Sequence, residues 1–136
     1  MKINKLNKIK ILFLTSEIAP FCSAYNLSKF SRAFSMILND NPLIEIRLSQ
    51  PKYGYISERK YILREVIRLK EVPIFFNSKE RVTSIKSAFI PNTKVQVYFL
   101  LDNECFGNTS SFIYKSKNGK PLKNNIENFT VFSLSL

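Results

Sequence analysis

The chain has 136 residues, which suffices for one domain with its own core and is too short for two. Hydrophobic residues make up 45% of the sequence, so we expect a folded chain, and 21 Lys and Arg against 10 Asp and Glu give a net charge of +11. There is no histidine, which excludes Ser-His-Asp triads, Cys-His pairs and HExxH zinc sites.

The first predicted element is a buried parallel strand over residues 8–15, where an aliphatic block follows a basic lead-in. After a Pro-containing loop, residues 25–38 are expected to form a helix because apolar residues recur at spacings of three and four. They form one apolar helix face: Leu27, Phe30, Ala33, Phe34, Ile37 and Leu38. Breakers end the helix, and residues 43–48 return to an extended pattern. The order strand, helix, strand predicts a βαβ unit.

The loop from Ser16 to Asn26 is the best candidate for a binding site, since open α/β folds bind ligands at the carboxyl ends of parallel strands. It contains neither GxGxxG nor a Walker lysine with its glycines, which excludes a dinucleotide or P-loop phosphate cradle. We name Ser16 and Glu17 as candidate substrate-binding residues. Glu17 has an alternative role, in which its carboxylate accepts backbone N–H groups at the start of the following helix.

The middle of the chain allows two interpretations. Residues 57–70 fit a helix, or a short turn of helix that leads into a strand from Glu65. Residues 81–90 and 94–101 alternate more plainly, with a turn between them, and predict an antiparallel hairpin.

Two further pairs of residues are candidates for the site. Asp102 and Asn103 follow the hairpin and either bind substrate in the same cleft or form a turn. Tyr53 and Tyr55 either offer a sugar-stacking surface or belong partly to the core.

The remaining features concern the end of the chain and its location. Residues 126–136 bring back apolar residues and stop without a cap, which suggests an element cut short. Cys22 and Cys105 have no CxxC spacing, so we expect buried or half-buried thiols in a reducing, cytoplasmic setting. The apolar run of residues 11–14 is too short for a signal peptide, and no segment approaches the roughly 18 apolar residues that cross a bilayer. We expect no cofactor, no metal and no membrane contact.

Four segments, in order, read KILFLTSEIAPF (residues 10–21), PKYG (51–54), VQVYFLLDNECF (95–106) and KNNIENFTVFS (123–133). They resemble the amino-terminal catalytic domain of bacterial glycogen and plant starch synthases, glucosyltransferases that use ADP-glucose. The resemblance covers nearly all of the chain but only the front part of a complete synthase. It implies an α/β fold, the Rossmann-like amino-terminal part of a GT-B glycosyltransferase, with an antiparallel hairpin and incomplete at its carboxyl end.

The resemblance implies a partial catalytic domain over residues 1–136, with ADP-glucose and an α-1,4-glucan as partners. In the family, the groups that hold the donor come mostly from a second domain. The family's KxGGL loop, whose lysine neutralises the ADP phosphates, falls on residues 23–27, which lack that lysine and both glycines. A family aspartate falls at Lys29, and the family's acidic DND falls at residues 124–126. We therefore name no catalytic residue and expect little or no synthase activity from the chain alone.

Two other classes of function are considered. A non-catalytic glucan-binding or regulatory remnant is the main alternative, and it would retain glucan without turnover. A basic nucleic-acid-binding protein is the other, since the net charge is +11. The basic residues are spread along the sequence and interleaved with acids, without an Arg-rich stripe, which disfavours nucleic acid.

Overall fold

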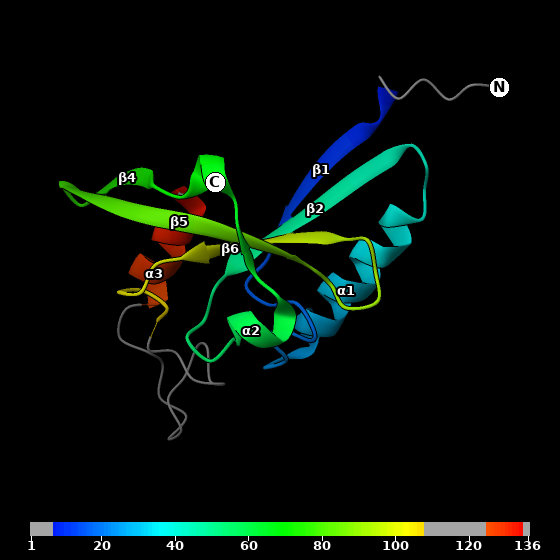
Figure 1. Ribbon diagram of the computed structural model, residues 1–136, viewed down its shortest axis with the longest axis horizontal. Helices are drawn as coiled ribbons and strands as arrows, with labels where there is room; N and C mark the ends of the chain where they lie inside the picture. Colours follow the sequence, from blue (N-terminus) through cyan, green and yellow to red (C-terminus); the bar gives the residue numbers. More distant parts are fainter. Residues whose placement is uncertain (1–6, 108–124, 135–136) are drawn as a thin grey trace.

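A mixed sheet forms the centre of the fold. The computed structural model describes residues 7–107 and 125–134 of the chain. Within these residues, six strands follow the order β1-β2-β6-β5-β3, with β4 paired to β5 outside this path (Figure 1). The strands are β1 (Ile9–Leu14), β2 (Ile44–Pro51), β3 (Arg64–Glu65), β4 (Val72–Phe76), β5 (Lys79–Phe89) and β6 (Gln96–Leu101). The helices are α1 (Asn26–Asn39), α2 (Glu58–Tyr61), the 3-10 turn η2 (Ile67–Leu69) and α3 (Asn125–Leu134).

The elements β1, α1 and β2 form the predicted βαβ unit. β1 and β2 run parallel, from the pair Ile9 and Ile44 to the pair Leu14 and Ser49. β6 lies parallel to β2 on its other side and antiparallel to β5. The predicted βαβ unit and the predicted hairpin are both confirmed, and the carboxyl ends of β1, β2 and β6 meet at one edge of the sheet.

Helix α1 turns serines toward the sheet, and of its apolar stripe only Phe34 and Leu38 pack partly against the core. Its buried side chains are those of Ser28, Ser31 and Ser35. Phe30 is 56% exposed and Ile37 70% exposed, so the predicted apolar face exists but points largely outward. Serine is small enough for the helix to approach the strands closely, and its hydroxyl finds a local partner: Ser31 Oγ lies 3.1 Å from Thr15 Oγ1.

The middle of the chain comes nearer to the second of its two interpretations: the short helical turn is confirmed, but the strand ends at Glu65, where it was expected to begin. Residues 57–70 form the single turn α2, then the two-residue strand β3 and the turn η2. The strand β4 was not predicted from the sequence. It joins β5 through Asn77 and Ser78, whose φ angles of 53° and 60° fit the type I′ turn that matches the twist of a hairpin.

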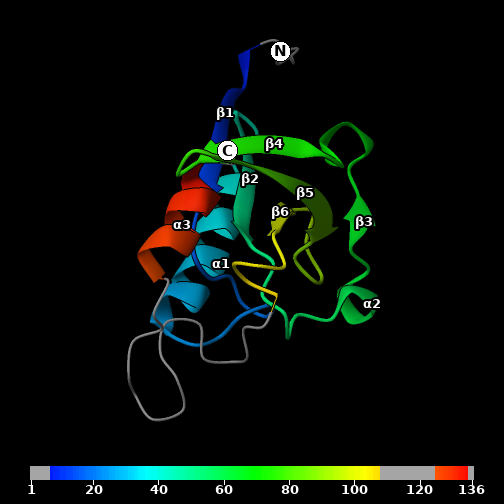
Figure 2. The same cartoon turned by 90° about the vertical axis from the view of Figure 1, so that its left-hand side faces the viewer.

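The core lies between the sheet and the elements that pack on it. Val97 and Phe99 of β6 are fully buried, and Phe106 beyond β6 packs against Phe129 of α3 with ring centroids 5.7 Å apart. Figure 2 shows α1 and α3 on one side of the molecule and α2 with β3 on the other. Helices long and apolar enough to span a membrane are absent from the described part of the chain. Residues 108–124, including the first position of the 124–126 segment, lie outside the described residues.

Candidate functional site

Three loops meet at the carboxyl ends of the parallel strands, which is the edge where open α/β folds bind ligands. They comprise residues 15–25 after β1, 52–57 after β2 and 102–107 after β6. Tyr53 is fully buried between them, and its Oη donates a hydrogen bond of 2.6 Å to the backbone carbonyl of Ser16. This hydrogen bond fixes the loop after β1 relative to the loop after β2. The Gly54 N–H donates to the Phe106 carbonyl at 2.9 Å, which fixes the loop after β6 as well.

Glu17 is fully buried and acts at the start of α1. Its Oε1 accepts a hydrogen bond of 3.1 Å from the backbone N–H of Ser28, and its Oε2 accepts one of 3.8 Å from the Cys22 thiol. Burial raises the pKa of the Glu17 carboxyl, against the opposing effect of hydrogen bonds from the backbone of Ser28 and Tyr25. Tyr25, the residue that begins the helix, has no side-chain cap of its own. Of the two roles predicted for Glu17, the structure thus supplies the geometry of the helix-capping carboxylate.

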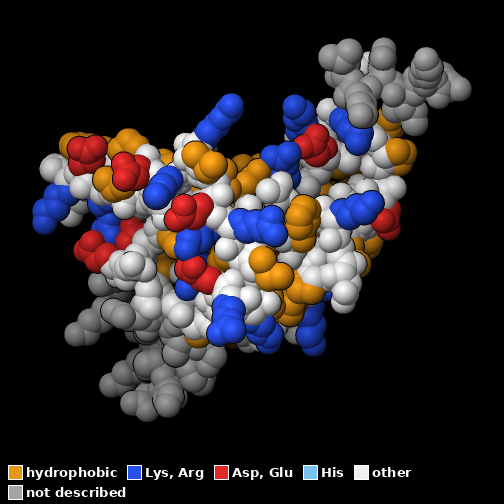
Figure 3. Space-filling model, viewed as in Figure 1, with side chains coloured by type: hydrophobic (Ala, Val, Ile, Leu, Met, Phe, Trp, Pro, Cys, Tyr) orange, Lys and Arg blue, Asp and Glu red, His pale blue; other side chains and the backbone are white. Residues whose placement is uncertain are grey.

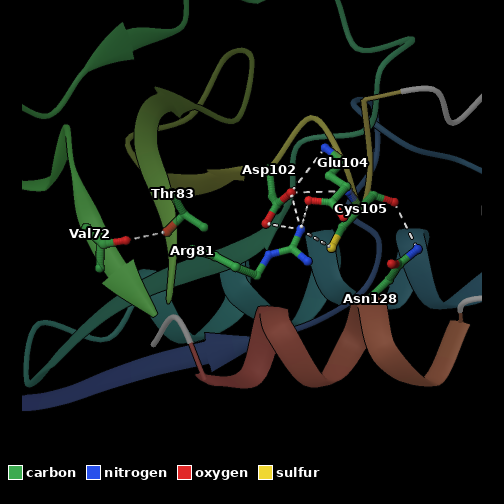
Figure 4. Close-up of polar contacts among 7 residues, drawn as sticks. All are labelled: Val72, Arg81, Thr83, Asp102, Glu104, Cys105 and Asn128. Atoms are coloured by element: carbon green, nitrogen blue, oxygen red, sulfur yellow. Dashed lines mark hydrogen bonds and ion pairs between the residues drawn. The ribbon is translucent and has the colours of Figure 1, made fainter. Parts of the chain in front are cut away.

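Asp102 organises the loop after β6 (Figure 4). Its Oδ1 accepts hydrogen bonds of 3.1 Å from the N–H groups of Glu104 and Cys105, and Arg81 Nη2 donates to both of its carboxylate oxygens at 2.9 and 3.0 Å. Partial burial lowers the pKa of Arg81, but the hydrogen bond and the negative charge of Asp102 raise it by more. The pKa of Arg81 therefore lies above its ordinary value. Burial and the charge of Asp102 raise the pKa of Cys105 to about 11. This arrangement matches the turn-forming alternative for Asp102.

The four predicted site residues all lie at this edge of the sheet, but in two loops. Ser16 is half-buried, and its carbonyl is engaged by Tyr53. Asn103 is exposed beside Asp102. The two carboxylates share no cavity: Glu17 points toward the start of α1, whereas Asp102 pairs with Arg81 of β5. Asp102 and Asn103 border a separate hollow of about 460 Å³ beside β5, which Ser16 and Glu17 do not line. The sequence predicted that both carboxylates lie at this edge because both follow β-strands, and it could not show which hydrogen-bond donors each carboxylate would meet.

A hollow of about 370 Å³ opens between the first two loops and α2. It is lined by Pro20, Phe21, Ser23, Ala24, Tyr55, Ile56, Ser57, Lys60 and Tyr61. Tyr55 stacks on the buried Tyr53 with ring centroids 6.1 Å apart, while Tyr61 Oη donates to the Pro20 carbonyl at 3.3 Å. Tyr53 therefore belongs to the core, which was one of the two alternatives predicted for this pair, whereas Tyr55 borders the hollow. Lys60 and Tyr61 were missed because their one-turn helix has no periodicity to mark it.

The side chains around this hollow are suited to binding. Burial raises the pKa of Tyr55. The hydrogen bond with Cys22 and the charges of Cys22 and Glu17 raise it further, so the Tyr55 hydroxyl is protonated at neutral pH. The hollow therefore offers phenol hydroxyls, an ammonium group and aromatic surface, which together fit a polyhydroxyl ligand. Within residues 7–107 and 125–134, no three His, Cys, Asp or Glu side chains gather as a metal site requires.

The basic side chains do not form a single patch on the face drawn in Figure 3. Lys and Arg are scattered over that face, and acidic side chains stand among them. Several are paired: Lys86 contacts Glu58 at 2.6 Å, and Arg47 contacts Glu45 at 3.0 Å. A continuous basic stripe of the kind that follows a phosphate backbone is not visible there.

Comparison with known proteins identifies relatives over most of the chain. The family model of the starch synthase catalytic domain matches residues 10–136. A glycogen synthase of Chlorobium limicola is 31% identical over 127 residues, which cover 93% of this chain and 26% of the relative. A glycogen synthase of Chlorobium chlorochromatii is 33% identical over 97 residues, which cover 71% of this chain and 20% of the relative.

A solved structure shares the fold. The catalytic domain of starch synthase IV from Arabidopsis thaliana, bound to ADP and acarbose, matches with a TM-score of 0.76 at 15% identity, over 94% of this chain and 24% of that one. This likeness confirms the expected fold class, the Rossmann-like part of a GT-B glycosyltransferase. The chain spans about a quarter of the length of the relatives it matches.

Proposed function

Since the chain belongs to the family of starch synthase catalytic domains, we propose that it is the amino-terminal, Rossmann-like part of a glucosyltransferase. The reaction of the whole protein is then the transfer of glucose from ADP-glucose to an α-1,4-glucan. The names of the relatives and the ADP and acarbose bound to the structural neighbour support this donor and acceptor. A cytoplasmic location is part of the proposal, supported by two buried cysteines that are not joined in a disulfide.

The contribution of this chain is to bind the glucan, and the hollow beside Tyr55 and Tyr61 carries this part of the proposal. Aromatic rings stack on the apolar faces of sugar rings, and Lys60, Ser23 and Ser57 add polar groups at the rim of the same hollow. Ser16 and Glu17 then support the site from beneath, because they hold the loop that forms one of its walls.

This chain lacks the groups that would bind the diphosphate of ADP-glucose, the glucose donor. Residues 23–27 carry no lysine and no glycine, so the loop before α1 offers neither a positive charge nor the close backbone approach that a diphosphate needs. We therefore expect the isolated chain to bind glucan and to transfer no glucose. A non-catalytic glucan-binding function remains the second candidate, favoured by the same aromatic hollow.

The experiment combines retention and turnover. The purified chain is run on native gels with and without glycogen, and a parallel sample is incubated with labelled ADP-glucose and glycogen. Retarded migration without incorporation of label is expected. Tyr55→Ala should restore free migration, whereas Phe75→Ala, at an exposed aromatic of β4 outside the hollow, should not.

Other outcomes contradict separate parts of this proposal. Migration unaffected by glycogen in the unaltered chain refutes glucan binding at this hollow. Incorporation of label refutes the inactivity of the isolated chain while it supports the donor. Binding to DNA that weakens steeply with added salt would favour the nucleic-acid alternative.

A further inference from the structure

A further hollow, of about 420 Å³, extends from α2 and β3 to the turn between β5 and β6, and the proposed function makes no use of it. We call it the α2–β5 hollow. Pro91 and Gln96 border it at the amino end of β6, so it reaches away from the sheet edge where the candidate site lies. Its volume is within the range of about 300–1,000 Å³ that is usual for small-molecule pockets.

The wall of the α2–β5 hollow is mainly apolar. Tyr61, Ile62 and Phe89 contribute to it, and the last two are 65% and 58% exposed. Ile62 ends α2 with a φ of 55°, a left-handed conformation that glycine or asparagine adopts far more readily than a β-branched residue. An apolar side chain thus stands in the wall at a position where the backbone favours glycine. Exposed apolar surface in a hollow can cover an aromatic ring of a ligand.

Two basic side chains, those of Lys60 and Arg64, border this wall. Among the described residues, no ion pair joins either of them to an acidic side chain, and the nearest acidic residues in the sequence, Glu58 and Glu65, pair with other lysines. Lys60 Nζ lies 5.2 Å from the centroid of the Tyr61 ring, which keeps the ammonium group beside the aromatic part of the wall. The hollow therefore combines apolar surface with two positive charges that acidic side chains do not neutralise.

The charge and the wall together indicate the class of ligand. A guanidinium group binds phosphate through parallel hydrogen bonds, and an ammonium group adds a point charge. A phosphate monoester carries a charge of about −1.5 to −2 at pH 7, which matches two cations, whereas a single carboxylate leaves one cation unpaired. An aromatic group esterified to the phosphate would cover the exposed surface of Ile62 and Phe89.

We propose that the α2–β5 hollow binds a phosphate monoester that carries an aromatic ring, with the phosphate on Lys60 and Arg64 and the ring against Ile62 and Phe89. This inference goes beyond the proposed function, since ADP-glucose has no terminal phosphate and an α-1,4-glucan has no charge.

The test is isothermal titration calorimetry of the chain with phenyl phosphate at neutral pH. The titration contains neither glycogen nor ADP-glucose, so its failure and the failure of the proposed function are separate results. Binding of one phenyl phosphate per chain is expected. Inorganic phosphate, which lacks the ring, and benzoate, which carries a single charge, should each bind at least about tenfold more weakly.

Substitutions show whether the binding takes place in this hollow. Arg64→Gln should weaken phenyl phosphate binding at least about tenfold, because it removes the guanidinium group. Arg59→Gln is the matched control, since it removes the same charge from an exposed position of α2 that does not line the hollow, and it should change the affinity less than about twofold. Phe89→Ser should weaken the binding of phenyl phosphate and leave that of inorganic phosphate unchanged.

Three results would overturn the proposal. The first is the absence of phenyl phosphate binding by the unaltered chain. The second is equal affinity for phenyl phosphate and inorganic phosphate, which would remove the role of the apolar wall. The third is an equal loss of affinity in Arg59→Gln and Arg64→Gln, which would assign the binding to the general positive charge of the chain.

Discussion

Replacement of Glu17 tests whether its carboxylate holds the start of α1. Glu17→Ala removes the acceptor of the Ser28 N–H and of the Cys22 thiol in a fully buried position. Loss of a helix cap costs about 0.5–2 kcal/mol, and an unsatisfied buried donor costs about 1–3 kcal/mol. Because these terms overlap, we expect the free energy of unfolding to fall by about 2–3 kcal/mol. Glu17→Gln keeps one carbonyl oxygen for Ser28 and should cost under about 1 kcal/mol at neutral pH.

The same pair of variants gives a pH dependence of defined sign. Burial raises the pKa of Glu17 above its ordinary value of 4.5, so the folded state binds a proton more tightly than the unfolded state does. The contribution of Glu17 to stability is therefore greatest below pH 4.5 and decreases as pH rises from 4.5 through the raised pKa. Glu17→Gln has no such titration, so its stability relative to the unaltered chain should increase over that interval.

Urea unfolding followed by circular dichroism, at a series of pH values from 4 to 8, measures both effects. The reasoning is refuted if Glu17→Gln destabilises as much as Glu17→Ala. It is also refuted if the unaltered chain gains stability relative to Glu17→Gln as the pH rises. If Glu17→Gln loses glycogen retention while its stability is unchanged, the result would favour the other predicted role of Glu17, in which it binds substrate directly.

Three other predictions concern packing and chemistry. Arg81→Met leaves Asp102 buried without its cation and should lower the free energy of unfolding by about 1–3 kcal/mol, measured by urea unfolding; an unchanged midpoint would contradict the ion pair. Ser31→Leu should push α1 away from the sheet at a cost of about 1–3 kcal/mol, whereas Ala33→Leu on the exposed side should change the thermal midpoint little. The two buried cysteines, whose pKa values are raised chiefly by burial, should react slowly with a thiol reagent at pH 8 in the native chain and completely in urea; fast native reaction of either thiol would contradict this.

The elements predicted correctly are those with a clear periodicity. β1, α1 and β2 follow from an aliphatic block, a helical repeat and breakers, and the hairpin of β5 and β6 follows from alternation. The strand β4 was missed because its turn uses Asn77 and Ser78 in place of the glycine that usually marks a type I′ turn. The orientation of α1 was missed because three buried serines carry no hydropathy signal.

For the candidate site, the sequence predicted where its loops lie but not what its side chains contact. The carboxyl ends of parallel strands pointed to the loops that meet in the structure, yet the partners of Glu17 and Asp102 depend on three-dimensional contacts. The raised pKa of Glu17 likewise arises from burial, which a single acidic residue in a polar loop does not reveal. Lys60 and Tyr61 reach the hollow from one helical turn, too short for a pattern to predict.

The place of β1 at the end of the sheet bears on the solubility of the chain, since among the described residues it pairs with β2 alone. Consecutive apolar residues such as residues 11–14 on an edge strand form a template onto which other extended segments can add, which is a common route to aggregation. At high concentration the isolated chain should thus aggregate more readily than one whose edge strand carries several charges.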